Sequence, residues 1–372
     1  MRAEHLYIHV PFCARRCVYC DFSIAVRSKV PVDEYLRALE LEWTIRHGDS
    51  AFDLSTVYLG GGTPSKLGAE GTTRLLDIVR KHATLRDNAE VTLEANPEDV
   101  SPQSAREWRT AGVNRVSVGV QSFDDTALAW MHRTHDSAAA RRAVQVLREV
   151  GIDNLSLDLI FAMPSQVARS WQRDLDEALA LDVPHVSVYG LTVEPRTPLG
   201  RWVARRHVVE APEESFEREF LQADAELSAA GFAHYEVSNY ARSNRHSRHN
   251  QAYWKRHAYA GLGPSAHEFD GRARRWNSDA YTRWVADLSC GDDPMGGSEE
   301  LDGGQVVAEE VYLSLRTSDG LLISANEAAH AQRWIDSGLA SVRSDSRLRL
   351  TGPGWLRLDY LASDLTMLRS RY

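Results

Sequence analysis

Short apolar runs alternate along the first half of the chain with longer segments in which apolar residues recur every three or four positions. The short runs are rich in β-branched and aromatic residues: LYIHV, TVYLGGG, EVTLEANP, NRVSVGVQSF, NLSLDLIF and HVSVYGLT. Their composition predicts strands, and the segments between them predict helices. Strands that alternate with helices favour parallel pairing through right-handed crossovers. The pattern therefore predicts an α/β fold, a partial (βα)6 barrel that lacks two units of the complete barrel.

Three of the predicted helices have clear boundaries in the sequence. One begins after Pro31 (VDEYLRALELEWTIRH), a second follows Ser65, and a third covers SAAARRAVQVLREVG. Gly151 is expected to end the third helix, because a glycine just past a helix can adopt the left-handed conformation that closes it.

The alternating pattern stops at about residue 200. An acidic helix (APEESFEREFLQADAELSAAG) leads into a segment rich in aromatic residues and histidines. After Asp302 come two helix-like stretches, QVVAEEVYLSL and ANEAAHAQRWIDSGL, then a hairpin-like stretch that ends near a final helix. Helices followed by a hairpin predict a small α+β domain of winged-helix type. We therefore expect three parts: a barrel over 1–200, a barrel-completing segment over 201–300 and the small domain over 301–372.

The composition is that of an ordinary globular protein, with 43% hydrophobic and 26% charged residues in 372. The formal net charge of −9 argues against broad nucleic-acid binding, and no basic recognition helix is visible in the last part. No apolar run approaches the roughly 20 residues of a membrane helix. The N-terminus shows no apolar core of a signal peptide, so we expect a cytoplasmic protein.

Three of the four cysteines fall within eight residues, in CARRCVYC from Cys13 to Cys20. A disulfide framework is typical of short secreted chains with an even number of cysteines, and a structural zinc site usually takes four ligands. One loop with three thiolates instead leaves a coordination position open, as in an iron–sulfur cluster that keeps one iron free. Zinc binding and redox sensing are the alternatives to such a cluster.

Residues with chemical potential recur at the predicted carboxyl ends of the strands, where barrels of this kind place their active sites. The cysteines follow the first strand, GGGTPS follows the second, and Glu94, Gln121 and Asp158 stand near the ends of the third, fourth and fifth. A glycine run lets the backbone approach a ligand closely, although it also suits a plain tight turn. For Glu94 and Asp158 the alternative is a helix cap or a solvated strand end.

The cysteine spacing resembles that of the radical S-adenosylmethionine superfamily. The resemblance implies that Cys13, Cys17 and Cys20 ligate a 4Fe–4S cluster whose open iron chelates S-adenosylmethionine, and that these cofactors carry the chemistry. Tyr19 would shield the cluster from water. The cofactor-binding residues that the resemblance implies are Tyr7, Tyr19, Gly61, Gly62, Thr63, Glu94, Gln121, Arg133 and Asp158.

Five motifs in matching order resemble the oxygen-independent coproporphyrinogen III oxidase family over nearly the whole chain: YIHVPFCARRCVYCDF, GGGTPS, EANPEDV, GVQSF and EVSNYA. True oxidases carry a further cysteine two residues after the third, where this chain has Phe22, and an extension before the first strand, which starts here at about Leu6. These differences, together with HNQAYW from His249 to Trp254, resemble the HemW branch of heme chaperones. IFAMPSQV and MHRTH depart from the usual family motifs.

The resemblance thus favours a chaperone that binds heme and hands it to acceptor hemoproteins, without coproporphyrinogen oxidase activity. The alternatives are the oxidase, which decarboxylates coproporphyrinogen propionates, and a zinc-stabilised barrel of unrelated function. The implied partners are heme and its acceptor proteins, with no nucleic acid. A respiratory-chain protein, a peripherally contacted membrane partner and a second copy of the chain are candidates among them.

The histidine-rich segment is expected to bind the heme, with His249 as an axial ligand of its iron, since neutral imidazole is a common ligand of heme iron. His246 is the next candidate, and His257 and His267 lie in the same region. The alternative is that His249 only hydrogen-bonds a loop under the barrel. Flat faces would come from Tyr240, Tyr253, Trp254 and Tyr259, and cations for the propionates from Arg242, Arg245, Arg248, Lys255 and Arg256.

Overall fold

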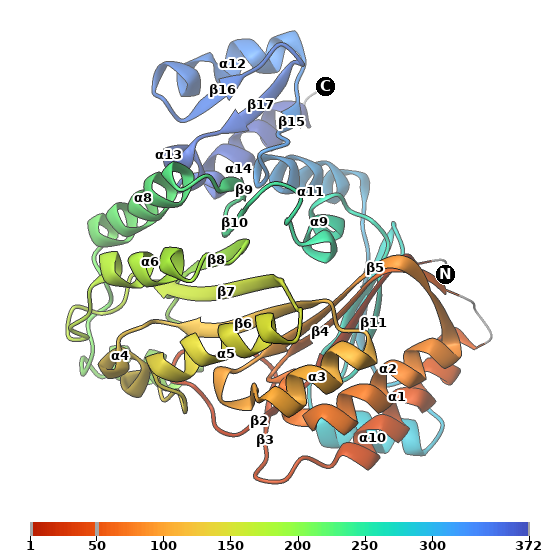
Figure 1. Ribbon diagram of the computed structural model, residues 1–372. Helices are drawn as coiled ribbons and strands as arrows, with labels where there is room; N and C mark the ends of the chain where they lie inside the picture. The colour runs from red at the N-terminus through yellow and green to blue at the C-terminus, as the bar shows by residue number, and fades with distance from the viewer. Residues whose placement is uncertain (1–2, 49–51, 371–372) are drawn as a thin grey trace.

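A curved nine-stranded sheet forms the centre of the protein in the computed structural model, which describes residues 3–48 and 52–370 (Figure 1). Across the sheet the strands are β11 (Ala260–Leu262), β1 (His5–Val10), β4 (Phe52–Gly61), β5 (Ala83–Ala95), β6 (Arg115–Gln121), β7 (Asn154–Phe161), β8 (His185–Gly190), β10 (Asn239–Ala241) and β9 (Ala233–Glu236). The six predicted strands, β1 and β4 to β8, pair in parallel in chain order. The predicted α/β fold with a parallel sheet is confirmed.

The sheet does not end with the sixth predicted strand. β11 adds to β1 in parallel, β10 pairs with β8 antiparallel, and β9 pairs with β10. These strands come from the segment over 201–300 that was expected to complete the barrel, and the boundaries of the three expected parts stay a prediction. These added strands have only three or four residues, too few for an alternating pattern to emerge from the sequence.

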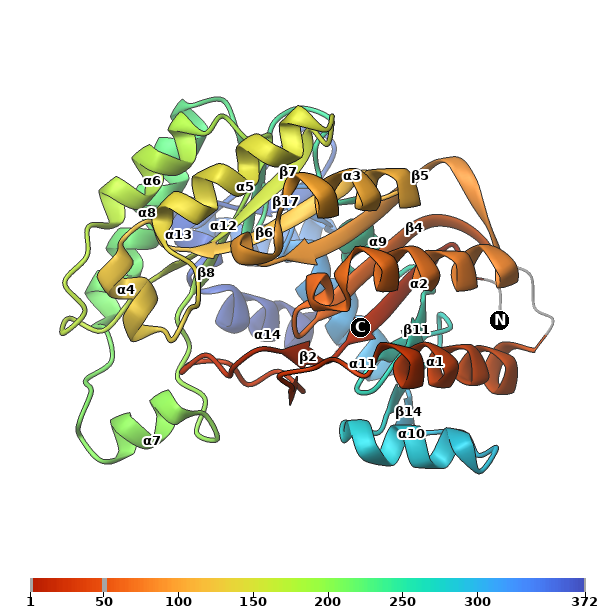
Figure 2. The same ribbon diagram turned by 60° about the horizontal axis from the view of Figure 1, so that its bottom comes forward.

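Helices cover the outer, convex face of the sheet (Figures 1 and 2): α1 (Val32–His47), α2 (Gly68–His82), α3 (Pro102–Ala111), α5 (Ser137–Glu149) and α6 (Trp171–Ala180). The three helices with predicted boundaries are confirmed, with a short 3-10 turn at 64–67 before α2. Asp136 caps α5 by accepting a hydrogen bond from the Ala139 amide. Gly151 follows α5 with φ of +80°, as expected of its role.

Alternate residues of β1 serve the two faces of the sheet. Leu6, Ile8 and Val10 are fully buried in the core, and each such side chain contributes roughly 1.5–3 kcal/mol on burial. Tyr7 and His9 point to the inner, concave side, where they line a cavity. The inner side of the sheet is therefore available for polar chemistry.

Helices and a small sheet complete the part of the chain before residue 302, with α8 (Glu213–Ala229) packed against α6 and α10 (Tyr281–Ser289) packed against α1. The other elements are α4 (Asp125–Trp130), α7 (Pro198–Ala204), α9 (Arg248–Trp254) and the small antiparallel sheet of β12 (His267–Phe269), β13 (Ala273–Asn277) and β14 (Met295–Glu300). In Figure 1, α9 lies within the curve of the sheet.

The last part of the chain forms a compact unit at the top of Figure 1. It consists of α11 (Gly303–Leu315), β15 (Leu321–Leu322), α12 (Ala325–Asp336), β16 (Ala340–Val342), β17 (Arg347–Leu350), α13 (Gly352–Trp355) and α14 (Leu358–Arg369). Its strands form an antiparallel sheet in the order β15, β17, β16, and α11 packs against α14. Helices, hairpin and final helix follow the predicted order, and the winged-helix type stays a prediction.

One buried carboxylate joins four parts of the fold. Glu42 of α1 is fully buried and accepts hydrogen bonds from Arg46 (2.6 Å), the Gly263 amide (2.8 Å), Asn277 (2.5 Å) and Trp284 (3.0 Å). Burial raises the pKa of Glu42, although Arg46 opposes the shift. A buried carboxylate is tolerated only when its partners satisfy it, so this one links α1 to β13, α10 and the turn after β11.

Replacement of Glu42 by Ala should lower the free energy of unfolding by about 3–5 kcal/mol, because it removes one of the two carboxylates that pair with buried Arg46 and leaves the Gly263 amide, Asn277 and Trp284 without this acceptor. Glu40→Ala on the same helix is the control. Glu40 pairs with Lys81 at the surface, and exposed pairs contribute about 0–1 kcal/mol. Urea unfolding at pH 7 measures both variants. Equal losses in the two variants would contradict this role of Glu42.

Candidate functional site

The parallel register brings the carboxyl ends of the first strands to one edge. Val10 pairs with Gly61 where β1 and β4 end, and Ala95 at the end of β5 pairs with Val118 of β6. The cysteine loop follows β1, the glycine turn follows β4, and Glu94 lies at the end of β5. The structure thus brings these sequence-predicted residues together.

The cysteine loop is held at both ends and in its middle. Cys13 lies in β2 (Phe12–Cys13), which pairs in parallel with β3 (Ala25–Val26) and closes the loop. Within the loop, the Val18 amide donates to the Met131 carbonyl (3.3 Å), and the Val18 carbonyl accepts from the Leu199 amide (2.8 Å). The three thiols are therefore presented from a fixed loop.

The thiols share a partly buried environment and form no disulfide with one another. Cys13 shares a hydrogen bond with the Thr63 hydroxyl (3.3 Å), and Arg133 donates to the Cys17 sulfur (3.7 Å). Burial, with a smaller contribution from the neighbouring charges of Cys20 and Cys17, raises the pKa of Cys13 to about 11, although the hydrogen bond with Thr63 opposes the shift. Crowded, partly buried thiolates are stable only with a compensating cation, so this donor set fits a metal cluster.

A single metal ion fits the described residues less well. No group of three or more His, Cys, Asp or Glu side chains in 3–48 and 52–370 converges closely enough to hold one ion. An iron–sulfur cluster instead distributes its thiolates over separate irons. Cys290 stands apart from the loop: Ser23 contacts Asp279 before α10, and Cys290 is exposed at the far end of this helix, roughly 14 Å further along.

The glycine turn packs tightly on the turn after β1. Gly61 has φ of +113°, and a Cβ there would lie 2.7 Å from the His9 ring. A Cβ at Gly62 would lie 2.7 Å from the Pro11 backbone. Both positions require glycine for this close approach, which is what a tight turn needs. Gly61 also lines the cavity.

Two carboxyl groups lie inside the barrel rather than at solvated strand ends. Glu94 accepts hydrogen bonds from the Tyr58 hydroxyl (2.8 Å) and the Gly61 amide (3.2 Å). Burial raises the pKa of Glu94 to about 7, and the nearby charge of Asp158 adds to the shift. Asp158 accepts a hydrogen bond from Ser117 (3.1 Å), and burial raises its pKa as well. Both carboxyl groups are partly buried and accept hydrogen bonds from neighbouring strands rather than from the start of a helix.

Arg133 meets several groups beside the cysteine loop. It donates to the Asn96 side chain (2.7 Å) and the Gly119 carbonyl (2.8 Å), besides Cys17. Gln121 has φ of +69°, and its amide lies close to Gly119. Sequence reasoning did not select Asn96, although it stands two residues after Glu94 in the EANPE motif.

Tyr19 contacts a small apolar cluster separate from the main core, which comprises Ala127, Leu128, Met131, Ile160, Met163 and Val167. Burial raises the pKa of Tyr19 well above its ordinary value. Its expected role, to shield the cluster from water, stays a prediction.

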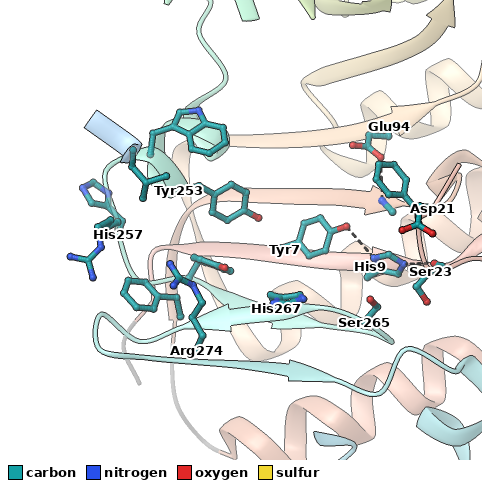
Figure 3. A pocket seen from close by; sticks show the side chains of 17 residues that line it. Tyr7, His9, Asp21, Ser23, Glu94, Tyr253, His257, Ser265, His267 and Arg274 are labelled. Carbon is teal, nitrogen blue, oxygen red and sulfur yellow. Dashed lines mark hydrogen bonds between the residues drawn. The ribbon is translucent and has the colours of Figure 1, made fainter. Parts of the chain in front are cut away.

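A cavity of about 600 Å³ extends from the cysteine loop to α9 and β12 (Figure 3). Figure 3 shows Asp21 and Ser23 at the end near the loop and His257 and Arg274 towards the opposite end; Phe22 and Arg256 also line the cavity. The aromatic residues along its walls are Tyr7, Phe22, Tyr253, Trp254, Tyr259 and Phe269. Phe22 leaves 68% of its surface exposed.

The histidines of the expected heme segment divide into three settings. His249 is 1% exposed, shares hydrogen bonds with Thr56 through Nδ1 (2.7 Å) and Tyr253 through Nε2 (2.8 Å), and burial lowers its pKa to about 3. Iron ligation by His249 therefore stays a prediction that requires Tyr253 to move away.

His246 lines a separate cavity of about 300 Å³ and bonds Gln251 (2.8 Å). His257 and His267 line the main cavity. Neither has a hydrogen-bond partner for its ring nitrogens within the described residues. These two histidines are thus the ones that offer free nitrogens to a ligand in the main cavity.

Few of the expected cations reach the main cavity. Arg242 pairs with Asp182, Arg248 donates to the Asn88 carbonyl, and Lys255 lines the smaller cavity. Arg256 does line the main cavity, and Arg274 of β13 joins it there. Sequence reasoning missed Arg274, because the stretch GRARRW carries no motif and only the antiparallel pairing of β12 and β13 brings it to the wall.

Known proteins are similar to this chain over most of its length. Residues 7–178 match the family model of the radical SAM superfamily. The heme chaperone HemW of Mycobacterium tuberculosis is 38% identical over 97% of this chain and 94% of its own length. The heme chaperone HemW of Bacillus subtilis is 35% identical over 85% of this chain and 84% of its own. This chain belongs to the HemW family.

A solved structure shares the fold of this HemW family member. Coproporphyrinogen III oxidase of Escherichia coli, a radical SAM enzyme, superimposes with a TM-score of 0.81 over 98% of this chain and 90% of its own. The two sequences are 22% identical, so the likeness establishes the fold alone. In the parts of the chain that the structure describes, no helix combines the length and apolarity needed to cross a membrane.

Replacement of Glu94 by Gln should flatten the pH dependence of stability in the metal-free protein. With a pKa of about 7 in the folded state, Glu94 holds a proton that the unfolded chain releases above pH 4.5. Its contribution is therefore present at low pH and is lost as the pH rises through about 7, by up to about 3 kcal/mol.

Urea unfolding at pH 5 and pH 8 measures this difference. The stability of Glu94→Gln relative to wild type should increase between the two values. Glu149→Gln, which removes an exposed carboxyl group at the end of α5, is the control and should follow wild type. A Glu94→Gln profile parallel to that of wild type would contradict the assignment.

Proposed function

We propose that this protein is a heme chaperone, which binds heme in the main cavity and hands it to acceptor hemoproteins. The observation that carries the proposal is the cavity itself, which joins the cysteine loop to the HNQAYW segment and has aromatic walls, free histidines and two arginines. Membership of the HemW family supports it, since the related proteins carry the name heme chaperone.

We propose further that Cys13, Cys17 and Cys20 hold a 4Fe–4S cluster. Their crowding, the donated hydrogen bond from Arg133 to Cys17 and the absence of a single-ion geometry in the described residues support this assignment. The chemistry of such a cluster is one-electron transfer to S-adenosylmethionine. The residues proposed to hold S-adenosylmethionine beside it are Tyr7, Gly61, Gly62, Thr63, Glu94, Gln121, Arg133 and Asp158.

The cavity suits a porphyrin in size and chemistry. Its volume of about 600 Å³ lies in the usual range of about 300–1,000 Å³ for ligand sites. Tyr253, Trp254 and Phe269 offer flat apolar faces, and His257 or His267 offers the iron a free nitrogen. His249 supports this wall from behind through its hydrogen bond to Tyr253.

The site gives no preference among acceptors. A hemoprotein of a respiratory chain, a membrane-bound partner and a second copy of the chain stay predictions of the family resemblance. The cytoplasmic location stays a prediction from the N-terminal sequence.

Replacement of any one of Cys13, Cys17 or Cys20 by Ala should abolish the 4Fe–4S absorption and the electron paramagnetic resonance signal after anaerobic reconstitution. Each supplies one of three thiolates, and no nearby thiol can substitute. Cys290→Ala is the matched control and should reconstitute as wild type. A lost cluster in the Cys290 variant, or an intact one in a loop variant, would show that the ligand set is different.

Heme titration should identify the iron ligand. The double variant His257→Ala/His267→Ala should lose the Soret shift of the bound heme, because it removes the free imidazoles that line the cavity. His249→Ala should keep the Soret band of the heme-bound wild-type protein but should bind heme more weakly. His330→Ala, in the C-terminal unit, is the control.

A lost Soret shift in His249→Ala with an intact double variant would instead establish His249 as the ligand. A coproporphyrinogen assay with reductant and S-adenosylmethionine runs in parallel. Efficient protoporphyrinogen formation by the wild-type protein would favour the oxidase over the chaperone.

A further inference from the structure

Two arginines meet at the end of the main cavity that lies away from the cysteine loop. Arg256 follows α9, and Arg274 lies on β13. Both guanidinium groups lie over the ring of Phe269, at 5.6 and 4.9 Å from its centroid. All three residues line the cavity. Two cations thus share one corner of an otherwise mostly aromatic wall.

A single carboxylate neutralises this corner from within the chain. Glu309 of α11 accepts a hydrogen bond from Arg256 Nε (3.0 Å) through one oxygen and one from Arg274 Nη1 through the other. Glu299 is the only other acidic group within 4 Å of either guanidinium in the described residues; it lies 3.9 Å from Arg274 and is half exposed. Glu309 therefore neutralises most of the positive charge of Arg256 and Arg274.

The pairing leaves a donor of Arg256 unused. Its Nη2 is buried and has no hydrogen-bond partner in the part of the chain that the structure describes. A buried guanidinium nitrogen without an acceptor is costly. A planar guanidinium is built to hold a carboxylate through two parallel bonds, and Glu309 engages Arg256 through Nε alone. Glu309 therefore does not use the full donor capacity of Arg256.

We propose that Arg256 and Arg274 form a carboxylate-binding subsite of the main cavity, which Glu309 fills until a carboxylate of the ligand displaces it. The inference rests on the proposed heme function, which brings a ligand with two propionates into this cavity. It places those propionates at the arginine end of the cavity. The porphyrin ring then lies along the aromatic walls and points towards the cysteine loop.

The exchange also connects the ligand to the C-terminal unit. Glu309 lies on α11, which packs against α14. In the structure its side chain ties α11 to the cavity wall through both arginines. When the ligand's carboxylate takes these arginines, that tie is released, so the empty and loaded forms differ in how firmly α11 is held.

The test compares heme with its dimethyl ester in the same detergent solution. Wild type should bind heme more tightly than the ester, because the ester lacks the carboxylates. Glu309→Gln removes the internal competitor and should tighten heme binding about tenfold while leaving ester binding unchanged. Arg274→Gln should weaken heme binding about tenfold and reduce the preference over the ester. Arg274→Lys keeps the positive charge but lacks the planar guanidinium. Its affinity for heme should lie between those of wild type and Arg274→Gln.

Glu310→Gln is the matched control, because Glu310 is the exposed neighbour on the same helix and lines only the smaller cavity. It makes the same charge change and should bind heme as wild type does. Equal affinity for heme and ester in wild type, or a Glu309→Gln variant that behaves like Glu310→Gln, would overturn the subsite while heme binding stands. A wild-type protein that binds neither would overturn the proposed function and the subsite together.

Discussion

The parallel register of β1, β4 and β5 is the constraint on which the site depends. It sets the ends of these strands level, so that the cysteine loop, the glycine turn and Glu94 meet at one edge. A shift by one residue would exchange the two faces of β1 and send Tyr7 and His9 into the helical layer. Gly61 and Gly62 allow the close packing that this register requires. A side chain at Gly61 would collide with the His9 ring of β1, and one at Gly62 with the Pro11 backbone just after β1.

Polar side chains are buried on the inner side of the sheet. Burying them is unfavourable unless they are hydrogen-bonded, and several of them bond one another. Thr56 links His5 to His249, which in turn holds Tyr253, and Glu94 joins Tyr58 to the Gly61 amide. Such buried networks are stable only when their members are satisfied. Among the side chains that line the main cavity, His257 and His267 have no hydrogen-bond partner in the described residues, so a ligand there could supply one.

The fold and the cysteine loop could be predicted from the sequence, because their signals are local. Alternation with a period near 3.6 marks α1, α2 and α5, and the cysteine spacing needs no partner elsewhere. The strands β9 to β11 and the Arg274–Glu309 pair depend on contacts between distant segments that no local pattern records. His249 shows the same limit: its motif indicates importance, but only the fold shows that both its ring nitrogens are already engaged.

The most direct test of the account is to locate the iron of bound heme by anomalous X-ray diffraction from crystals of the heme-loaded protein. The account predicts an iron peak in the main cavity, within coordination distance of His257 or His267, besides the peak of the cluster at the cysteine loop. An iron peak in the smaller cavity beside His246, or on the outer surface, would contradict the proposal that this cavity is the heme site.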